Sequence, residues 1–315
     1  LTLRGLSADL ALDGIQDGAL NINLSGSARA QGGAWPLFGP AAGDDIPELS
    51  AMKAALGDFA VALPAFRLMT GSQGTRFTLQ APARITPRNG GALTLTAAGA
   101  PLFEVEPGQA GGGAVNVTAT RGAGLPEATF AIPAWRLTPG GFSATLDGRA
   151  ALDFGLARGV ALSTRGDLAS DGGRLTYTTR DCIPLTVERL ELDENDITNV
   201  AGSFCPPSGP LFTVADGRWQ ARGALWGVSA DAPFLALRFS EAQGTLAVDG
   251  GPEGLTMDAR VATAQVEDAT RPRRFNTATA TGGARLDGER WSGAFDLAIG
   301  PHALGRLTLT HDGAT

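Results

Sequence analysis

The sequence is almost without lysine, tyrosine and histidine. Lys53 is its only lysine, Tyr177 its only tyrosine, and His302 and His311 are its only histidines. Lys and Arg number 25 against 32 Asp and Glu, which gives a formal net charge of -7. An acidic chain without a basic stripe repels phosphate backbones, and this excludes nucleic acid as a partner. Aromatic residues make up only 6% of the 315 residues, which predicts a thin or open apolar core.

The motifs of catalysis and of metal binding are also absent from the sequence. Two histidines are too few to form a metal cage without carboxylate help. The acidic run 193–196 lacks the spacing and the glycine of a helix-loop-helix calcium site. There is no Gly-x-Ser-x-Gly elbow, no phosphate-binding glycine loop with a lysine, and no Cys/His nucleophile pair. We therefore expect no catalytic residue, no metal and no cofactor, and a protein that is not an enzyme.

No run of apolar residues approaches the roughly 20 needed to cross a bilayer. The most apolar run, 59–63, ends at Pro64. No secretory signal precedes the first strand pattern. The chain begins with Leu1 and ends at Thr315, so we expect a segment excised from a longer, membrane-anchored protein. Residues 1–315 are taken as a single elongated segment, with targeting and anchoring regions outside it.

An alternation of apolar and polar residues extends through the whole chain. In 142–154 every even position is apolar or glycine, while nearly every odd position is polar or charged. Successive side chains of a strand point to opposite faces, so the pattern predicts strands with one apolar and one polar face. Asp-Gly pairs, such as Asp147-Gly148, Asp171-Gly172 and Asp216-Gly217, are typical of hairpin turns. We predict an all-β fold, a long, curled antiparallel meander that forms an open hydrophobic groove with a half-pipe shape.

One short helix is predicted near residues 46–56. Asp45 lies near a cap position, Pro47 suits the first turn and Gly57 the end of a helix. Leu49, Met52 and Leu56 would share one face of it. The helix would either plug one end of the groove or lie along the sheet.

The two cysteines, Cys182 and Cys205, are predicted to form a disulfide in an oxidising compartment. The alternative is a pair of small buried side chains in a reducing one. Prolines flank both cysteines and deny that region backbone donors, so we expect a sheet edge or an excursion near residues 180–210, tied down by the disulfide.

The apolar face is the candidate functional surface. It could be the core of a sandwich or barrel, in which facing sheets bury each other. It could instead be an open groove for something apolar. The residues expected to line that groove are Leu20, Ile22, Leu24, Phe77, Leu79, Leu93, Leu95, Val115, Val117, Phe142, Leu146, Leu152, Phe154, Leu235, Leu237, Phe239, Met257, Phe295, Leu297 and Ile299.

These features resemble the AsmA-like bridge-type lipid-transfer proteins of Gram-negative bacteria, and within them the YdbH-like branch. The resemblance rests on the long meander, on the helix-then-strand unit of 46–64, and on the segments 182–185 and 204–206 around an acidic centre. It implies a periplasmic protein, anchored in the inner membrane through a region outside this segment, whose groove conducts phospholipids. The implied partners are phospholipid acyl chains, membranes at both ends, and an outer-membrane lipoprotein. The family has no catalytic residues.

The leading hypothesis is therefore non-enzymatic transport of phospholipids between the inner and outer membranes along a hydrophobic groove. Covering the acyl chains matters because exposing each methylene to water costs about 0.8 kcal/mol. One alternative is a periplasmic scaffold that guides the assembly of outer-membrane proteins by offering a strand edge. Another is a structural β-solenoid surface protein, whose rungs would fill the apolar face themselves.

Overall fold

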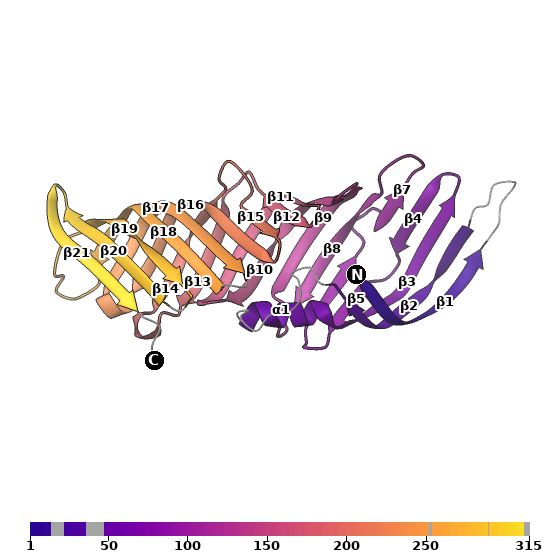
Figure 1. The fold of residues 1–315 in the computed structure, drawn as a ribbon, viewed down its shortest axis with the longest axis horizontal. Helices are drawn as coiled ribbons and strands as arrows, with labels where there is room; N and C mark the ends of the chain where they lie inside the picture. The colour runs from indigo at the N-terminus through magenta and orange to yellow at the C-terminus, as the bar shows by residue number, and fades with distance from the viewer. Residues whose placement is uncertain (14–21, 36–46, 252–253, 289, 312–315) are drawn as a thin grey trace. The chain divides into compact units, whose positions relative to one another are not determined.

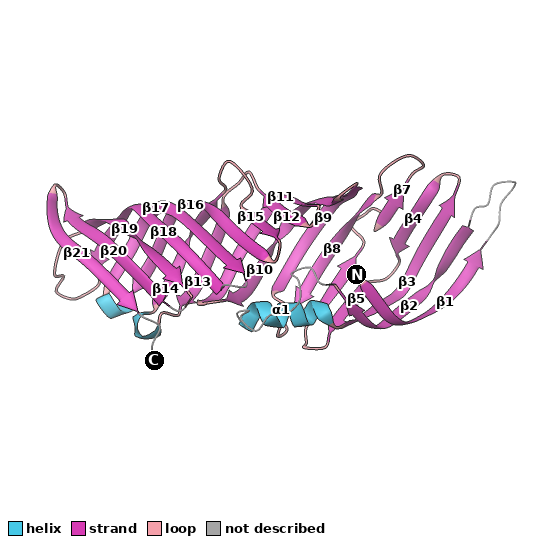
Figure 2. Cartoon of the chain, viewed as in Figure 1, coloured by secondary structure: helices cyan, strands magenta, loops and turns pink. Residues whose placement is uncertain are grey.

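The structure is a computed structural model that describes residues 1–13, 22–35, 47–251, 254–288 and 290–311. Its strands form an antiparallel sheet of 21 strands, and one α-helix accompanies them in the described residues (Figures 1 and 2). The predicted all-β meander with a single short helix is confirmed.

The chain divides into two compact units. Among the described residues, unit 1 comprises those up to Ala150 together with 165–175, and unit 2 comprises 151–164 and those from Thr176 on. The strands of unit 1 are β1 (Thr2–Asp13), β2 (Ile22–Ala34), β3 (Phe59–Gly71), β4 (Gly74–Leu79), β5 (Ala83–Pro87), β6 (Ala92–Thr96), β7 (Phe103–Val105), β8 (Gly112–Thr120) and β9 (Glu127–Thr138).

Three strands contribute residues to both units, namely β10 (Gly141–Phe154), β11 (Ala157–Asp171) and β12 (Arg174–Thr178). The strands of unit 2 are β13 (Ile183–Leu190), β14 (Ile197–Cys205), β15 (Phe212–Ala215), β16 (Arg218–Ala232), β17 (Leu237–Gly251), β18 (Gly254–Asp268), β19 (Ala278–Asp287), β20 (Arg290–Ile299) and β21 (His302–His311). Unit 2 also contains the short 3-10 helices η1 (Asp193–Asn195) and η2 (Pro233–Leu235).

Strand pairing follows chain order through most of each unit. In unit 1, β1 pairs with β2 and β2 with β3, while β3 pairs with β5 near its start and with β4 near its end. β8 likewise pairs with both β6 and β7. In unit 2, β16 to β21 pair in unbroken order. Short connections of this kind dictate antiparallel pairing.

The Asp-Gly pairs behave in two ways. Asp171-Gly172 and Asp216-Gly217 lie at turns, as predicted, whereas Asp147-Gly148 lies inside β10. A Cβ on Gly148 would come within 2.2 Å of the carbonyl oxygen of Thr129. The glycine therefore permits a close approach of two backbones and does not mark a turn there.

A row of β-bulges crosses unit 2. Register shifts occur in neighbouring positions of the β14–β16, β16–β17, β17–β18 and β18–β19 pairings. Gly227, with φ 61°, and Glu241, with φ 52°, supply left-handed backbone at two of them. A bulge bends its strand and increases the local twist, so aligned bulges curve the sheet. They also exchange odd and even positions between the faces, which places Leu246 and Phe239 on the same side of β17.

Helix α1 (Pro47–Gly57) belongs to unit 1 and lies along the lower ends of β5 and β8 in Figure 1. Its Leu49 and Ala55 are buried. The side-chain amide of Asn89 donates to the Ala51 carbonyl at 2.8 Å, and the Trp35 N–H donates to that of Leu56 at 2.7 Å. The helix is thus fixed to the turns at the strand ends.

The predicted disulfide between Cys182 and Cys205 is present, with a Cα–Cα distance of 4.0 Å. Cys182 directly precedes β13 and Cys205 ends β14, and Ile183 is paired with Phe204 beside them. β13 also pairs with β11, and β14 with β16. The segment predicted as an excursion therefore contributes strands to the sheet itself.

The apolar core of each unit is thin. Among the described residues, Val266 is the largest side chain with less than 2% of its surface exposed, and the others below that level are alanines. Two sheets packed face to face enclose large aliphatic and aromatic side chains completely. Complete burial limited to alanine and one valine is what a single layer produces, in which side chains are covered mainly by their neighbours on the same face.

Candidate functional site

Unit 2 carries an apolar face that crosses β16–β21 in three adjacent rows. The strand register aligns the members of each row from strand to strand. The first row contains Ala221, Val248, Met257, Leu286 and Trp291; the second contains Gly223, Leu246, Ala259, Ala284, Gly293 and Leu309; the third contains Leu225, Gly244, Val261, Gly282, Phe295 and Leu307. Leu286 and Gly293 are buried, and the other members are partly exposed.

Unit 1 repeats this arrangement on its own strands. One row joins Leu24 of β2 to Leu68, Phe77 and Phe103 on β3, β4 and β7. A second row consists of Ala30, Val61, Ile85, Leu93, Ala119 and Ala128. At the β1 edge of this face, Leu6 is 68% exposed, Leu10 54% and Leu12 61%. We refer to these surfaces as the apolar faces of unit 1 and unit 2.

The opposite side of the sheet is polar. Arg222 contacts Asp249 at 3.3 Å across β16 and β17, and Arg165 pairs with Asp147 across β10 and β11. Exposed ion pairs of this kind contribute at most about 1 kcal/mol each. These ion pairs show that this side of the sheet is exposed to water. The surface whose exposure needs an explanation is therefore the apolar side.

Aromatic rings on the apolar faces lie over glycines of the neighbouring strand. A Cβ built on Gly250 would stand 2.3 Å from Cε2 of Trp219, and one on Gly33 would stand 2.4 Å from Cε2 of Phe59. The same relation joins Phe130 to Gly148, at 2.5 Å. Rings that pack against a glycine backbone bury apolar area without a second layer of protein above them. Contacts within the sheet itself therefore stabilise the apolar faces, and these rings do not require a second layer of protein to cover them.

The structure places most of the predicted groove residues on these faces. Leu20 lies outside the described residues. Leu235 lies in η2 and not on a strand, where it packs against the core cluster of unit 2. Leu79, Val115 and Leu237 are buried, and the remaining described members are partly exposed. Leu246, Val248 and Leu286 also belong to the apolar face of unit 2, although they are not among the predicted groove residues, and the cross-strand register assigns them to it.

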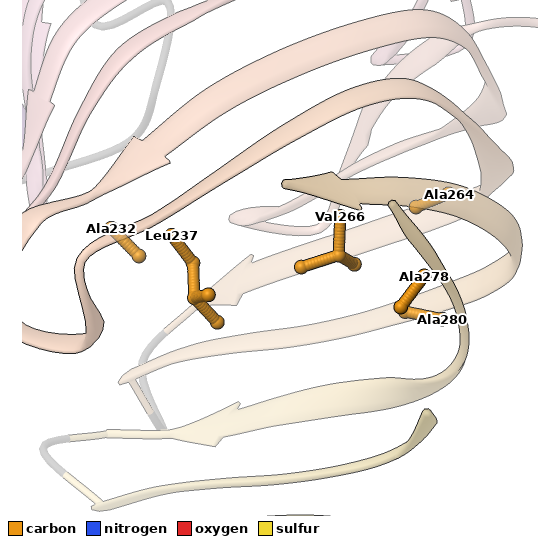
Figure 3. Close-up of a cluster of buried hydrophobic side chains, with 6 residues drawn as sticks. All are labelled: Ala232, Leu237, Ala264, Val266, Ala278 and Ala280. Carbon is orange, nitrogen blue, oxygen red and sulfur yellow. The ribbon is translucent and has the colours of Figure 1, made fainter. Parts of the chain in front are cut away.

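A small closed core ends the apolar face of unit 2. Ala232, Leu237, Ala264, Val266, Ala278 and Ala280 form this cluster, and Figure 3 shows Leu237 and Val266 directed into the same volume. Phe234 and Leu235 of η2 and Phe275 of the loop 269–277 pack against it. The margin of the apolar face is therefore covered by η2 and by the loop 269–277, which lie outside the strands. The three rows have no such cover from these segments.

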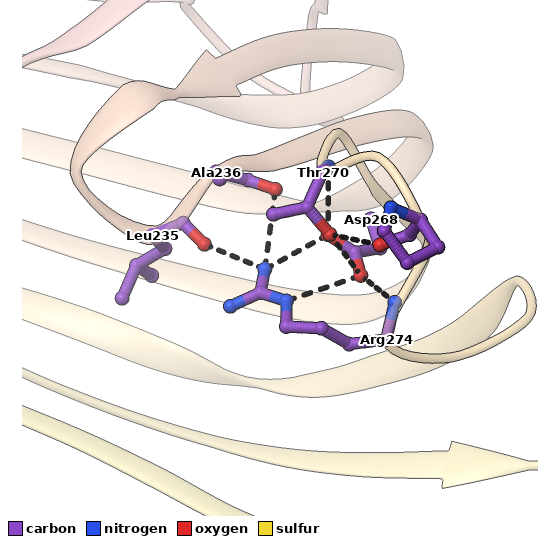
Figure 4. A network of polar contacts seen from close by, with 6 residues as sticks. Leu235, Ala236, Asp268, Thr270 and Arg274 are labelled. Carbon is purple, nitrogen blue, oxygen red and sulfur yellow. Dashed lines mark hydrogen bonds and ion pairs between the residues drawn. The ribbon is translucent and has the colours of Figure 1, made fainter.

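A polar network fixes that loop (Figure 4). The Asp268 side chain is fully buried and accepts hydrogen bonds from Nε and Nη2 of Arg274, at 3.0 and 2.9 Å, and from the Thr270 N–H at 2.9 Å. Arg274 Nη2 also donates to the Leu235 carbonyl at 2.9 Å. The Arg274 guanidinium holds the pKa of the Asp268 carboxyl well below its usual range, and the Thr270 and Arg274 N–H groups act in the same direction against the effect of burial.

The described residues contain no group of three or more His, Cys, Asp and Glu side chains that could hold a metal ion. None of the helices in that part of the chain has the length and apolarity required to cross a membrane. Comparisons with family models, with curated proteins and with solved structures gave no match for this chain. The case for a function therefore rests on the apolar faces.

Proposed function

We propose that the chain is a non-enzymatic lipid carrier, whose apolar faces hold phospholipid acyl chains during transport between the inner and outer membranes of a bacterial envelope. The observation that supports this most is the set of three aligned apolar rows in unit 2, whose larger side chains, with the exception of the buried Leu286, stay partly exposed. A soluble protein rarely leaves a contiguous apolar surface of this kind without a ligand or partner.

The chemistry of an acyl chain matches this surface. A phospholipid needs continuous cover for its methylenes, each worth about 0.8 kcal/mol, and needs no hydrogen-bond donor along the chain. The rows offer aliphatic and aromatic side chains interspersed with glycine, and the polar side of the same strands stays solvated. The disulfide adds support for an oxidising compartment such as the periplasm.

Photo-crosslinking in cells tests the proposal. A photoreactive residue at Leu246, on the apolar face of unit 2, is compared with one at the adjacent Thr245, which is exposed on the polar side. We expect phospholipid adducts from position 246 and none from position 245. Equal labelling from both positions, or adducts from position 245 alone, would contradict the proposal. Leu237 is unsuitable as a probe because only 8% of it is exposed.

A further inference from the structure

We propose that Arg271 and Arg273 form a headgroup site, which binds the phosphate of an anionic phospholipid whose acyl chains lie on the apolar face of unit 2. The inference rests on the proposed lipid carriage and adds to it a preference for one class of headgroup. It starts from the loop 269–277, where three arginines occur within four residues of an otherwise acidic chain.

The three arginines have different roles. Arg274 is committed to Asp268 and to the carbonyl of Leu235. Arg271 and Arg273 are exposed, and neither forms an ion pair with any residue in the described part of the chain. Because the Asp268–Arg274 pair is internally neutral, these two guanidiniums leave the loop with uncompensated positive charge.

The loop is anchored and does not need to be ordered by a ligand. Asp268 lies at the end of β18 and binds groups on both sides of the Arg271–Pro272 pair, from Thr270 and from Arg274. Directly after Arg274 in the chain, Phe275 packs against the core cluster of unit 2. Arginine suits phosphate because its planar guanidinium donates two parallel hydrogen bonds, and a fixed backbone lowers the entropy lost on binding.

The loop lies next to the apolar rows, so a phospholipid could place its headgroup at the loop and its acyl chains on the rows. It follows directly from the strand that carries Met257 and Val261 of the apolar rows, and it covers the margin at which those rows end. A lipid lying on the rows with its headgroup at this margin would keep its phosphate in water beside the arginines. Two unpaired guanidiniums favour a net negative headgroup over a zwitterionic one, whose quaternary ammonium they repel.

The test uses a double variant and a charge-matched control. R271Q/R273Q removes both guanidiniums, and R285Q/R290Q removes two exposed arginines of β19 and β20. Each protein is incubated with vesicles of phosphatidylglycerol or of phosphatidylcholine, separated from the vesicles by size exclusion, and assayed for bound lipid. Thermal unfolding verifies that both variants fold.

We expect the native protein and R285Q/R290Q to extract phosphatidylglycerol about tenfold better than phosphatidylcholine, as one charge-assisted contact predicts. R271Q/R273Q should extract both lipids equally. Retention of the preference by R271Q/R273Q, or its loss in R285Q/R290Q, overturns the headgroup site and leaves lipid carriage standing. Failure of the native protein to extract either lipid overturns both proposals.

Two further outcomes separate the lipid from other sources of phosphate. If glycerol 3-phosphate displaces bound phosphatidylglycerol at equimolar concentration, the site takes a free phosphate ester and the inference fails. If the native protein stays with phosphatidylglycerol vesicles without extracting lipid, and R271Q/R273Q does not, the arginines contact a membrane surface and the inference also fails.

Discussion

A negative charge placed on the apolar face of unit 2 should abolish lipid binding and leave the fold intact. Leu246 lies in the central row, and its cross-strand neighbours are Gly223 and Ala259. These neighbours are small, so the longer side chain of Leu246→Glu has space on the face. If the face is open, the carboxylate reaches water, and we expect the free energy of unfolding to change by about 1 kcal/mol or less.

The effect of Leu246→Glu on lipid binding follows from the same geometry. Strands are spaced about 4.8 Å apart, so a hydrated carboxylate in the row displaces about four methylenes of an acyl chain. At about 0.8 kcal/mol per methylene the loss is about 3 kcal/mol, which is more than a hundredfold in Kd. The assay is titration with a fluorescent phospholipid, together with urea unfolding of the lipid-free protein.

Thr245→Glu is the matched control. It introduces the same charge one residue away, on the polar side and opposite Arg260, so we expect neither lipid binding nor stability to fall. Two results would refute the reasoning. Loss of about 3 kcal/mol or more of stability in Leu246→Glu alone would show that the row is an internal core. Equal lipid binding by both variants would show that acyl chains do not lie on this face.

Three further outcomes test the framework of the sheet and its margin. The double substitution Cys182→Ser with Cys205→Ser removes a crosslink between residues 23 apart. The free energy of unfolding should therefore fall by about 3 kcal/mol and the urea midpoint by about 1.5 M. An unchanged midpoint would contradict this prediction. Asp268→Asn should lower the melting temperature at pH 7. The depressed pKa of Asp268 gives stability that is present above the ordinary Asp pKa of about 3.9 and is lost as the pH falls below it. The melting temperature of the native protein should therefore fall more steeply than that of Asp268→Asn below about pH 4, and parallel curves would refute the role of the carboxylate.

The strands, the helix and the disulfide could be predicted because each depends on local pattern. Alternation over 142–154 predicts β10, and Pro47 with Gly57 delimits α1. The cysteine pair was predictable from the absence of any other thiol, and the register of β13 and β14 confirms it. These features need no knowledge of what lies beside them in space.

Part of the membership of the apolar faces could not be predicted from alternation alone. The bulge at Glu241 exchanges odd and even positions within β17, so Phe239 and Leu246 share a face that simple alternation would split. Alternation predicts a strand that includes Leu235, but Pro233 begins the 3-10 helix η2, which ends at Leu235. The Asp268–Arg274 network joins residues six apart through a loop, and its only signal in the sequence is an arginine run beside a proline.

Stability and openness are linked in this sheet. In a conventional closed core, the packing of the apolar side chains stabilises the fold, so loss of that packing would unfold the protein. Here several aromatic side chains pack on glycines of the same layer, as Trp219 does on Gly250, and the closed cluster of unit 2 lies at the margin of its face. Under the proposed function, we therefore expect the apolar rows of unit 2 to gain and lose a ligand while the strands stay paired. This separation is what a carrier requires, because each lipid that enters must also be able to leave.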